Sequence, residues 1–155
     1  MQNEVLIYLL CQIANTTPNY GFLSAFGAGP FVTILAPGAY ATVKGYVAQA
    51  SSGFVSVNPA TGLFTMGRAD THRVSFSVSA QPGVNDQLEA DIAVNGVPSD
   101  LIAAHGSTVT PPKLFCMSGT GIISFNAGDT LSLMIQNTAS TTCVISHAQM
   151  SCGAP

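Results

Sequence analysis

Two stretches in which large apolar residues occupy every second position flank a short interruption of this pattern near position 127. Ile123 and Phe125 alternate with serine before the break, and three apolar residues alternate with Ser and Met over 131–135 after it. A period of two is typical of a half-buried β-strand. The break, Asn-Ala-Gly-Asp at 126–129, contains a glycine that tolerates positive φ and polar side chains that bond their own backbone. Residues 119–135 are therefore predicted to form a β-hairpin whose apolar face other strands must cover.

The same alternation recurs through most of the chain. Residues 72–80, HRVSFSVSA, place valine and phenylalanine on one face and serine on the other. Turn signals such as Pro-Gly, Asn-Pro and Asn-Gly separate the strand candidates, and residues 105–112 are predicted to be a loop. The further strand candidates are 31–35, 40–48, 54–57, 63–66, 88–94, 114–117 and 142–152. Nine or ten short strands predict an all-β fold, a jelly-roll β-sandwich of roughly ten antiparallel strands.

Residues 1–30 differ from the rest of the chain. Glu4 is their only charge, and their apolar residues are too dense for a solvated surface. They are predicted to form an N-terminal arm for attachment or oligomer packing, with residues 31–155 forming the jelly-roll domain. The pattern over residues 4–15 leaves a short helix and a buried strand equally open. The predicted attachment residues are Val5, Leu6, Ile7, Leu9 and Leu10.

The low content of charged residues indicates an unusual protein surface. Only 7% of the 155 residues are Asp, Glu, Lys or Arg, against about 25% in an ordinary soluble domain. With 47% hydrophobic residues, this favours a surface covered by identical subunits or by a larger assembly over a neutral, hydroxyl-rich monomer. Four basic residues are too few for a nucleic-acid partner, and no apolar run approaches the ~20 residues of a membrane span.

Targeting and redox signals are weak. Residues 5–10 resemble a short signal-peptide core, but no positive charge precedes them and no small-x-small cleavage site follows, so no targeting segment is expected. Asn15 begins a glycosylation sequon that has meaning only in a secreted protein. The lack of C-x-x-C spacing argues against zinc, and the strand-like surroundings favour reduced thiols over disulfides. The cysteines are Cys11, Cys116, Cys143 and Cys152.

Candidate chemistry is sparse. His72 and Asp70 could join a serine in a triad, but no G-x-S-x-G pattern is present, and His72 is interpreted as a rim residue of a strand. No pattern pairs a nucleophile with a base or holds a cofactor, so the protein is predicted not to be an enzyme and to need no cofactor.

The only acidic cluster in the sequence is Asp86, Glu89 and Asp91. Calcium prefers several such oxygen ligands. The cluster lacks the spacing of a dedicated loop, however, and a solvated charged edge that discourages aggregation is the favoured interpretation, with no metal site predicted. His105 and His147 are isolated and are interpreted as structural or solvent-facing.

Several motifs together resemble one family. Residues 57–65 (VNPATGLFT), followed by 73–79 (RVSFSVS), resemble the "N-x-x-T-G-x-F-T … Y-x-F-x-F-x-V" stretch of complement first-component globular heads and their bacterial and viral relatives. Residues 92–98 resemble the strand and turn that follow there, and residues 119–133 are similar to the family's "G-x-x-x-L-x-A-G-D-x-V-x-L" segment. This resemblance implies a ten-stranded jelly roll assembled as a tight three-fold trimer, as in the tumour necrosis factor superfamily.

The chain also departs from the family pattern. The family's tyrosine corresponds to His72, and the last strand lacks the usual Phe-Ser-Gly-Phe ending. The sequence has no collagen-like Gly-x-y stalk, so the head is expected to attach by its own arm.

These observations together predict a homotrimer with Phe125, Leu133, Ile145 and His147 nearest the three-fold axis. The functional hypothesis is a non-enzymatic structural virion protein, a trimeric capsid decoration (cement) protein or fibre head of a phage. Its expected partner is the major capsid protein or another virion protein, and its expected location is the virion, after assembly in the host cytoplasm. The alternative is a secreted or cell-surface trimeric ligand or adhesin head that binds a receptor through loops at 81–86 and 103–112.

Overall fold

The computed structural model describes residues 19–26, 37–82, 87–107, 114–138 and 143–155. Within these ranges every regular element is a β-strand, and no helix could cross a membrane. The strands are β1 (Tyr20–Phe26), β2 (Tyr40–Thr42), β3 (Ala48–Ser52), β4 (Val55–Asn58), β5 (Leu63–Met66), β6 (Asp70–Pro82), β7 (Gln87–Val94), β8 (Val97–Ser107), β9 (Phe115–Phe125), β10 (Thr130–Asn137) and β11 (Cys143–Gly153).

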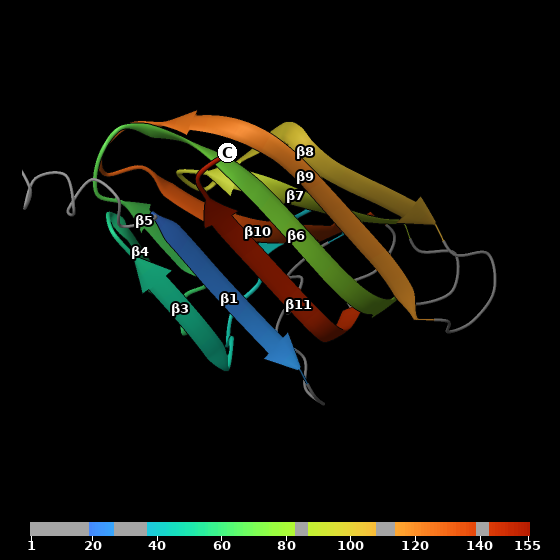
Figure 1. The fold of residues 1–155 in the computed structure, drawn as a ribbon. Helices are drawn as coiled ribbons and strands as arrows, with labels where there is room; N and C mark the ends of the chain where they lie inside the picture. The colour runs from blue at the N-terminus through green and yellow to red at the C-terminus, as the bar shows by residue number, and fades with distance from the viewer. Residues whose placement is uncertain (1–18, 27–36, 83–86, 108–113, 139–142) are drawn as a thin grey trace, which may run out of the picture.

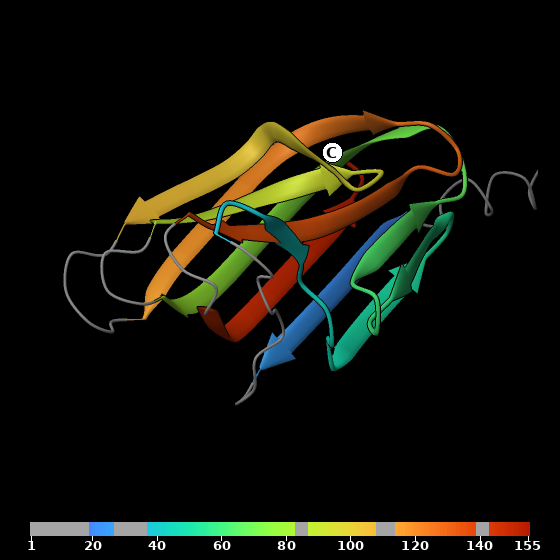
Figure 2. The ribbon, with the colours of Figure 1, turned by 180° about the vertical axis from the view of Figure 1, so that it is seen from behind.

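The strands form two sheets that pack face to face. Sheet A has the order β3-β1-β11-β6-β9 and lies at the front of Figure 1. Sheet B has the order β4-β5-β10-β7-β8, with β2 also paired to β10, and faces the viewer in Figure 2. Every pairing is antiparallel. The prediction of an all-β jelly-roll sandwich is confirmed.

The core between the sheets follows from the alternation in the sequence. In β6, Val74, Phe76 and Val78 are buried, while the serines between them face outward. Sheet B contributes the inward set of β10 and the ring of Phe64. Burying such side chains stabilises the fold by about 25 cal/mol for each Å² of apolar surface removed from water. The largest fully buried side chains are Phe64, Leu23, Met66, Leu88, Ile92, Leu131, Leu133, Ile135, Ile145, Met150 and Val43.

The predicted hairpin at 119–135 is wrong in its pairing. β9 pairs with β6 in sheet A, whereas β10 pairs with β7, β5 and β2 in sheet B. The chain therefore crosses from one sheet to the other at residues 126–129 and does not fold back on itself. The apolar face of each arm was predicted correctly, because Ile123 and Leu133 both point into the sandwich.

Asp129 holds this crossing in place. Its carboxylate accepts the backbone N–H of Asn126 at 2.7 Å and the side-chain amide of Asn95 at 2.8 Å. Its backbone carbonyl accepts the N–H of Met66 at 2.9 Å, while Gly128, at φ +89°, donates to the carbonyl of Met66 at 2.7 Å. The amide of Asn95 holds the pKa of the Asp129 carboxyl below its usual range. One turn thus joins β9 and β10 to β5 and to the β7–β8 turn.

The predicted boundary between arm and domain lies too far along the chain. β1, at Tyr20–Phe26, is an internal strand of sheet A, between β3 and β11. Its Gly21 packs closely against the opposite sheet, because a Cβ there would lie 2.5 Å from the ring of Phe64, so only glycine fits. The sandwich therefore begins by residue 20. The arm residues Val5, Leu6, Ile7, Leu9 and Leu10 lie outside the described residues, and their role stays a prediction.

Other boundaries also differ from those predicted. The strand expected at 40–48 is interrupted, because β2 ends at Thr42 and β3 begins at Ala48. The loop expected from residue 105 begins later, since β8 continues to Ser107. The strand expected at 31–35 lies outside the described residues.

The β4–β5 turn generates a stability prediction. Gly62 has φ +73°, and a Cβ there would lie 2.0 Å from the carbonyl oxygen of Val43. Gly128 also has positive φ, but its Cβ would meet nothing within 4 Å. We expect Gly128→Ala to lower the free energy of unfolding by about 1–2 kcal/mol, the cost of the left-handed conformation alone. We expect Gly62→Ala to lower it by more, because the backbone must also move.

Denaturant unfolding of the two variants and the wild type measures this difference. Equal destabilisation of the two variants would contradict the close approach of Val43 to Gly62.

Candidate functional site

The outward side of sheet A carries rows of small, uncharged side chains. Ser75 lies beside Thr120 on β9 and Ser151 on β11, and Ser77 lies beside Ser118 and Gln149 in the next row. Hydroxyl groups bond across these rows, as between Ser75 and Thr120 at 3.0 Å. We call this surface the neutral face. It comprises the outward side chains Tyr20, Phe22, Ser24, Ser75, Ser77, Ser79, Cys116, Ser118, Thr120, Ile122, His147, Gln149 and Ser151.

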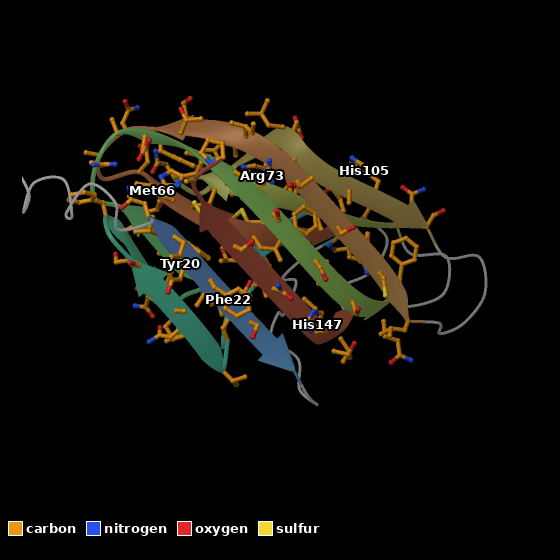
Figure 3. The ribbon with its side chains drawn as sticks, viewed as in Figure 1. Tyr20, Phe22, Met66, Arg73, His105 and His147 are labelled. Atoms are coloured by element: carbon orange, nitrogen blue, oxygen red, sulfur yellow. The ribbon has the colours of Figure 1, made fainter. Side chains whose placement is uncertain are left out.

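Charge is nearly absent from the neutral face. Apart from Asp70 at the start of β6, Arg73 is the only Asp, Glu, Lys or Arg in β1, β6, β9 and β11. Figure 3 shows Arg73 with Tyr20, Phe22 and His147 on these strands. A pocket of about 350 Å³ lies between Tyr20, Phe22 and Arg73. Beside it, Ile122 of β9 leaves 61% of its surface exposed. These apolar groups lie among uncharged neighbours, with Arg73 as the one charged side chain beside them.

Three of the four residues predicted to lie nearest a three-fold axis are buried within the subunit. Phe125, Leu133 and Ile145 belong to the core between the sheets and have no surface for a neighbouring subunit. This part of the prediction is wrong, because it chose the inward members of the alternation. Of the four, only His147 lies on the neutral face, where it is half-buried opposite Ser79. Residues that alternate with the core, such as Ile122, are the ones that face outward.

The outward side of sheet B, unlike the neutral face, carries a group of acidic side chains. Glu89 and Asp91 point outward from β7, and Asp100 of β8 joins them, so that one carboxylate oxygen from each lies within 4.8 Å of the others. The interpretation as a solvated edge is wrong, because β7 lies between β10 and β8 and Asp91 is completely buried. Asp86, the third predicted member, lies outside the described residues. Sequence reasoning missed Asp100, which only a local irregularity of β8 brings to β7.

A pocket of about 340 Å³ opens beside this acidic group. It is lined by Gln87, Glu89, His105 and Thr138, among others. His105 is 68% exposed, and its Nδ1 lies 3.6 Å from Oε2 of Glu89, so the two form an ion pair when the imidazole is protonated. Of the two alternatives left open for His105, structural or solvent-facing, its exposure fits the second, but the interpretation as isolated missed this carboxylate.

The geometry around His72 does not resemble a catalytic triad. Its ring is 3% exposed and packs against Phe125 with ring centroids 6.1 Å apart. Nε2 lies 4.0 Å from Asp70, whose carboxylate is already bound to Arg68 at 3.1 Å. Backbone and Arg68 hydrogen bonds hold the pKa of the Asp70 carboxyl below its usual range. An imidazole enclosed in the core cannot reach a substrate, so His72 is a core residue and not the rim residue predicted.

Two cysteines lie among the described side chains, and both are free thiols. Cys116 is exposed on the neutral face, 3.3 Å from the hydroxyl of Ser79. Cys152 is buried, and this burial raises the pKa of its thiol to about 12. For these two residues the preference for reduced thiols agrees with the structure, whereas the side chains of Cys11 and Cys143 lie outside the described residues.

Comparison with protein-family models and with curated proteins finds no match. Solved structures do match over most of the chain. The globular domain of zebrafish complement 1qA protein matches with a TM-score of 0.62 at 12% identity, covering 88% of this chain and 96% of its own. Murine APRIL, solved at pH 5.0, matches with a TM-score of 0.58 at 8% identity, covering 86% and 98%. The chain has their fold. This confirms the predicted tumour necrosis factor and complement first-component type of jelly roll, and identities this low show nothing beyond the fold.

The thiols generate a prediction about reactivity. We expect Cys152 to resist a thiol reagent at about pH 8 in the folded protein, because its thiol is buried and stays protonated. After unfolding, both Cys116 and Cys152 should react without prior reduction. Mass spectrometry of labelled peptides measures this, with Cys152→Ser as the control for assignment. A requirement for reductant at either residue would contradict the free thiols.

Proposed function

We propose that the protein is a non-catalytic head that assembles as a homotrimer through the neutral face. The observation that carries this proposal is the contrast between the two outer surfaces. Sheet A presents small uncharged residues with apolar groups among them, and Asp70 and Arg73 are its only charged residues, while three carboxylates gather on sheet B. The resemblance of residues 57–65 and 119–133 to complement first-component heads supports three-fold assembly.

Low desolvation cost favours the neutral face as a subunit interface. Covering Lys or Glu in an interface costs free energy unless each charge finds a partner, whereas Ser and Thr are already bonded to one another across the rows. Small side chains also let a second subunit approach closely over a wide area. The exposed apolar residues Tyr20 and Ile122 then gain by burial.

The apolar N-terminal segment supports a more specific role in a virion. Residues 5–10, VLIYLL, would gain by burial against a larger shell at about 25 cal/mol per Å². Three such segments on one trimer would bind a lattice of matching symmetry with avidity. We therefore propose a capsid decoration protein or fibre head, with a major capsid protein or another virion protein as partner.

The competing role is a trimeric ligand or adhesin head that binds a receptor. The observation that favours it is the fold itself, shared with murine APRIL and the complement 1qA globular domain. In this role the partner contacts the head, and residues 1–18 contribute nothing to binding.

A pair of matched substitutions tests the assembly face. Ile122 on sheet A and Val97 on sheet B are both exposed aliphatic residues, at 61% and 66%. We expect Ile122→Arg to shift the protein from trimer to monomer, because three further guanidinium groups, each beside that of Arg73, would be desolvated in the interface. Val97→Arg should leave the trimer intact. Light scattering coupled to size-exclusion chromatography measures the mass.

A wild-type protein that remains a monomer at micromolar concentration would contradict the proposed homotrimer. Dissociation by Val97→Arg but not by Ile122→Arg would place the interface on sheet B.

A deletion tests the role of the N-terminal segment. The deletion must end at residue 18, because Asn19 bonds Asp70 and the backbone of Phe54, and β1 follows at once. We expect the shortened chain to keep its trimer and to lose binding to capsids. Cosedimentation with capsids of the virus that encodes the protein measures this. Decoration that equals that of the full chain would refute the attachment role.

A further inference from the structure

Three carboxylates on the outward side of sheet B come together without a lysine or arginine partner in the strands of that sheet. Glu89 and Asp91 are two residues apart on β7 and so share one face, and Asp100 approaches from β8. One oxygen from each lies within 4.8 Å of the others. None of the strands of sheet B contains a Lys or Arg, and among the described ion pairs only His105, largely exposed, lies near the group.

An irregularity in β8 creates the cluster. Asp91 pairs with Ala103 and Ala93 with Pro98, so four residues of β8 lie opposite the single residue Ile92. Within this segment Asp100 takes φ +55°, which is uncommon for a residue with a side chain. Its backbone N–H donates to Oδ2 of Asp91 at 3.1 Å. The segment therefore folds around the Asp91 carboxylate.

Asp91 itself shows that the cluster is unsatisfied by protein groups alone. The residue is 0% exposed. The backbone N–H groups of Ser99 and Asp100 approach its carboxylate, yet its Oδ1 has no hydrogen-bond partner of normal geometry in the protein. Buried carboxylate oxygens are normally bonded, because an unpaired one carries the full cost of leaving water. This burial also raises the pKa of the Asp91 carboxyl. An oxygen that is buried, unpaired and close to two further carboxylates points to a cation as its partner.

We propose that Glu89, Asp91 and Asp100 bind a divalent cation of the calcium type. An all-oxygen donor set selects hard cations, and calcium accepts irregular arrangements of carboxylates completed by water better than magnesium does. Asp100 is exposed and the neighbouring pocket reaches Glu89, so water has access to the open side. The hydroxyl of Tyr40 on β2 donates to Glu89 and orients that carboxylate from outside the cluster. The site lies on sheet B and does not depend on assembly through the neutral face.

Calcium titration of the full chain tests the proposal. In calcium-free buffer we expect saturable binding by isothermal titration calorimetry, with a dissociation constant in the range of about 0.1–1 mM that is usual for exposed sites. About 10 mM CaCl₂ should then raise the Tm by roughly 3–10 °C. The same concentration of MgCl₂ should have a smaller effect.

Isosteric variants locate the site. Asp91→Asn removes the buried charge, so we expect a Tm without calcium equal to or above that of the wild type, together with loss of the calcium response. Asp100→Asn should weaken calcium binding at least tenfold. The matched control is Asp70→Asn, an acid bound to Arg68 at the start of β6, which should bind calcium as the wild type does.

Three results would overturn the proposal. The first is a wild type that gives neither binding heat nor a Tm shift with calcium. The second is binding that persists unchanged in Asp91→Asn, and the third is a response to magnesium as strong as the response to calcium.

Discussion

The crossing of the chain between the two sheets at residues 126–129 is the constraint on which the sandwich depends. β9 must end in one sheet and β10 must begin in the other, each with its apolar residues turned inward. Asp129 achieves this by bonding Asn126 within the turn and Asn95 on the β7–β8 turn, while the backbone of the turn pairs with Met66. Thr130 is held in the same way, because its N–H donates to the side chain of Asn95 at 2.9 Å. Small polar groups at one end of the molecule thus set the position of the sheets that enclose the core.

The two outer surfaces differ in chemistry and suit different roles. Sheet A presents a surface of hydroxyl groups and scattered apolar side chains that loses little when it is desolvated. Sheet B keeps three carboxylates, of which Asp91 is enclosed by its neighbours. A head built in this way can use one sheet for assembly and leave the other for ligands or partners, because the core separates the two surfaces. The proposed cation site and the proposed trimer therefore make independent demands on the chain.

Much of the candidate assembly face follows from the alternation in β6, yet the sequence prediction chose the wrong residues for it. Phe125, Leu133 and Ile145 were expected at a subunit interface because they are large and apolar. A chain of this length needs those same residues for its own core, and the structure places them there. The serines of residues 72–80 were noted only as an outward face, and they are the residues that form the neutral surface.

The period-two pattern in the sequence was sufficient to determine the class of fold and the inward side of strands such as β6 and β10, because burial of one face is a local demand that a half-buried strand must meet. The glycine at 128 likewise marked its turn, since positive φ is a local requirement. Pairing was decided only in three dimensions. A short turn between two alternating runs looks the same whether the chain returns to its own sheet or crosses to the next, so the crossing at 126–129 was mistaken for a hairpin. The burial of β1 and the meeting of Asp91 with Asp100 were also tertiary outcomes, because they depend on Phe64 and on an irregularity of β8 that no sequence period reveals.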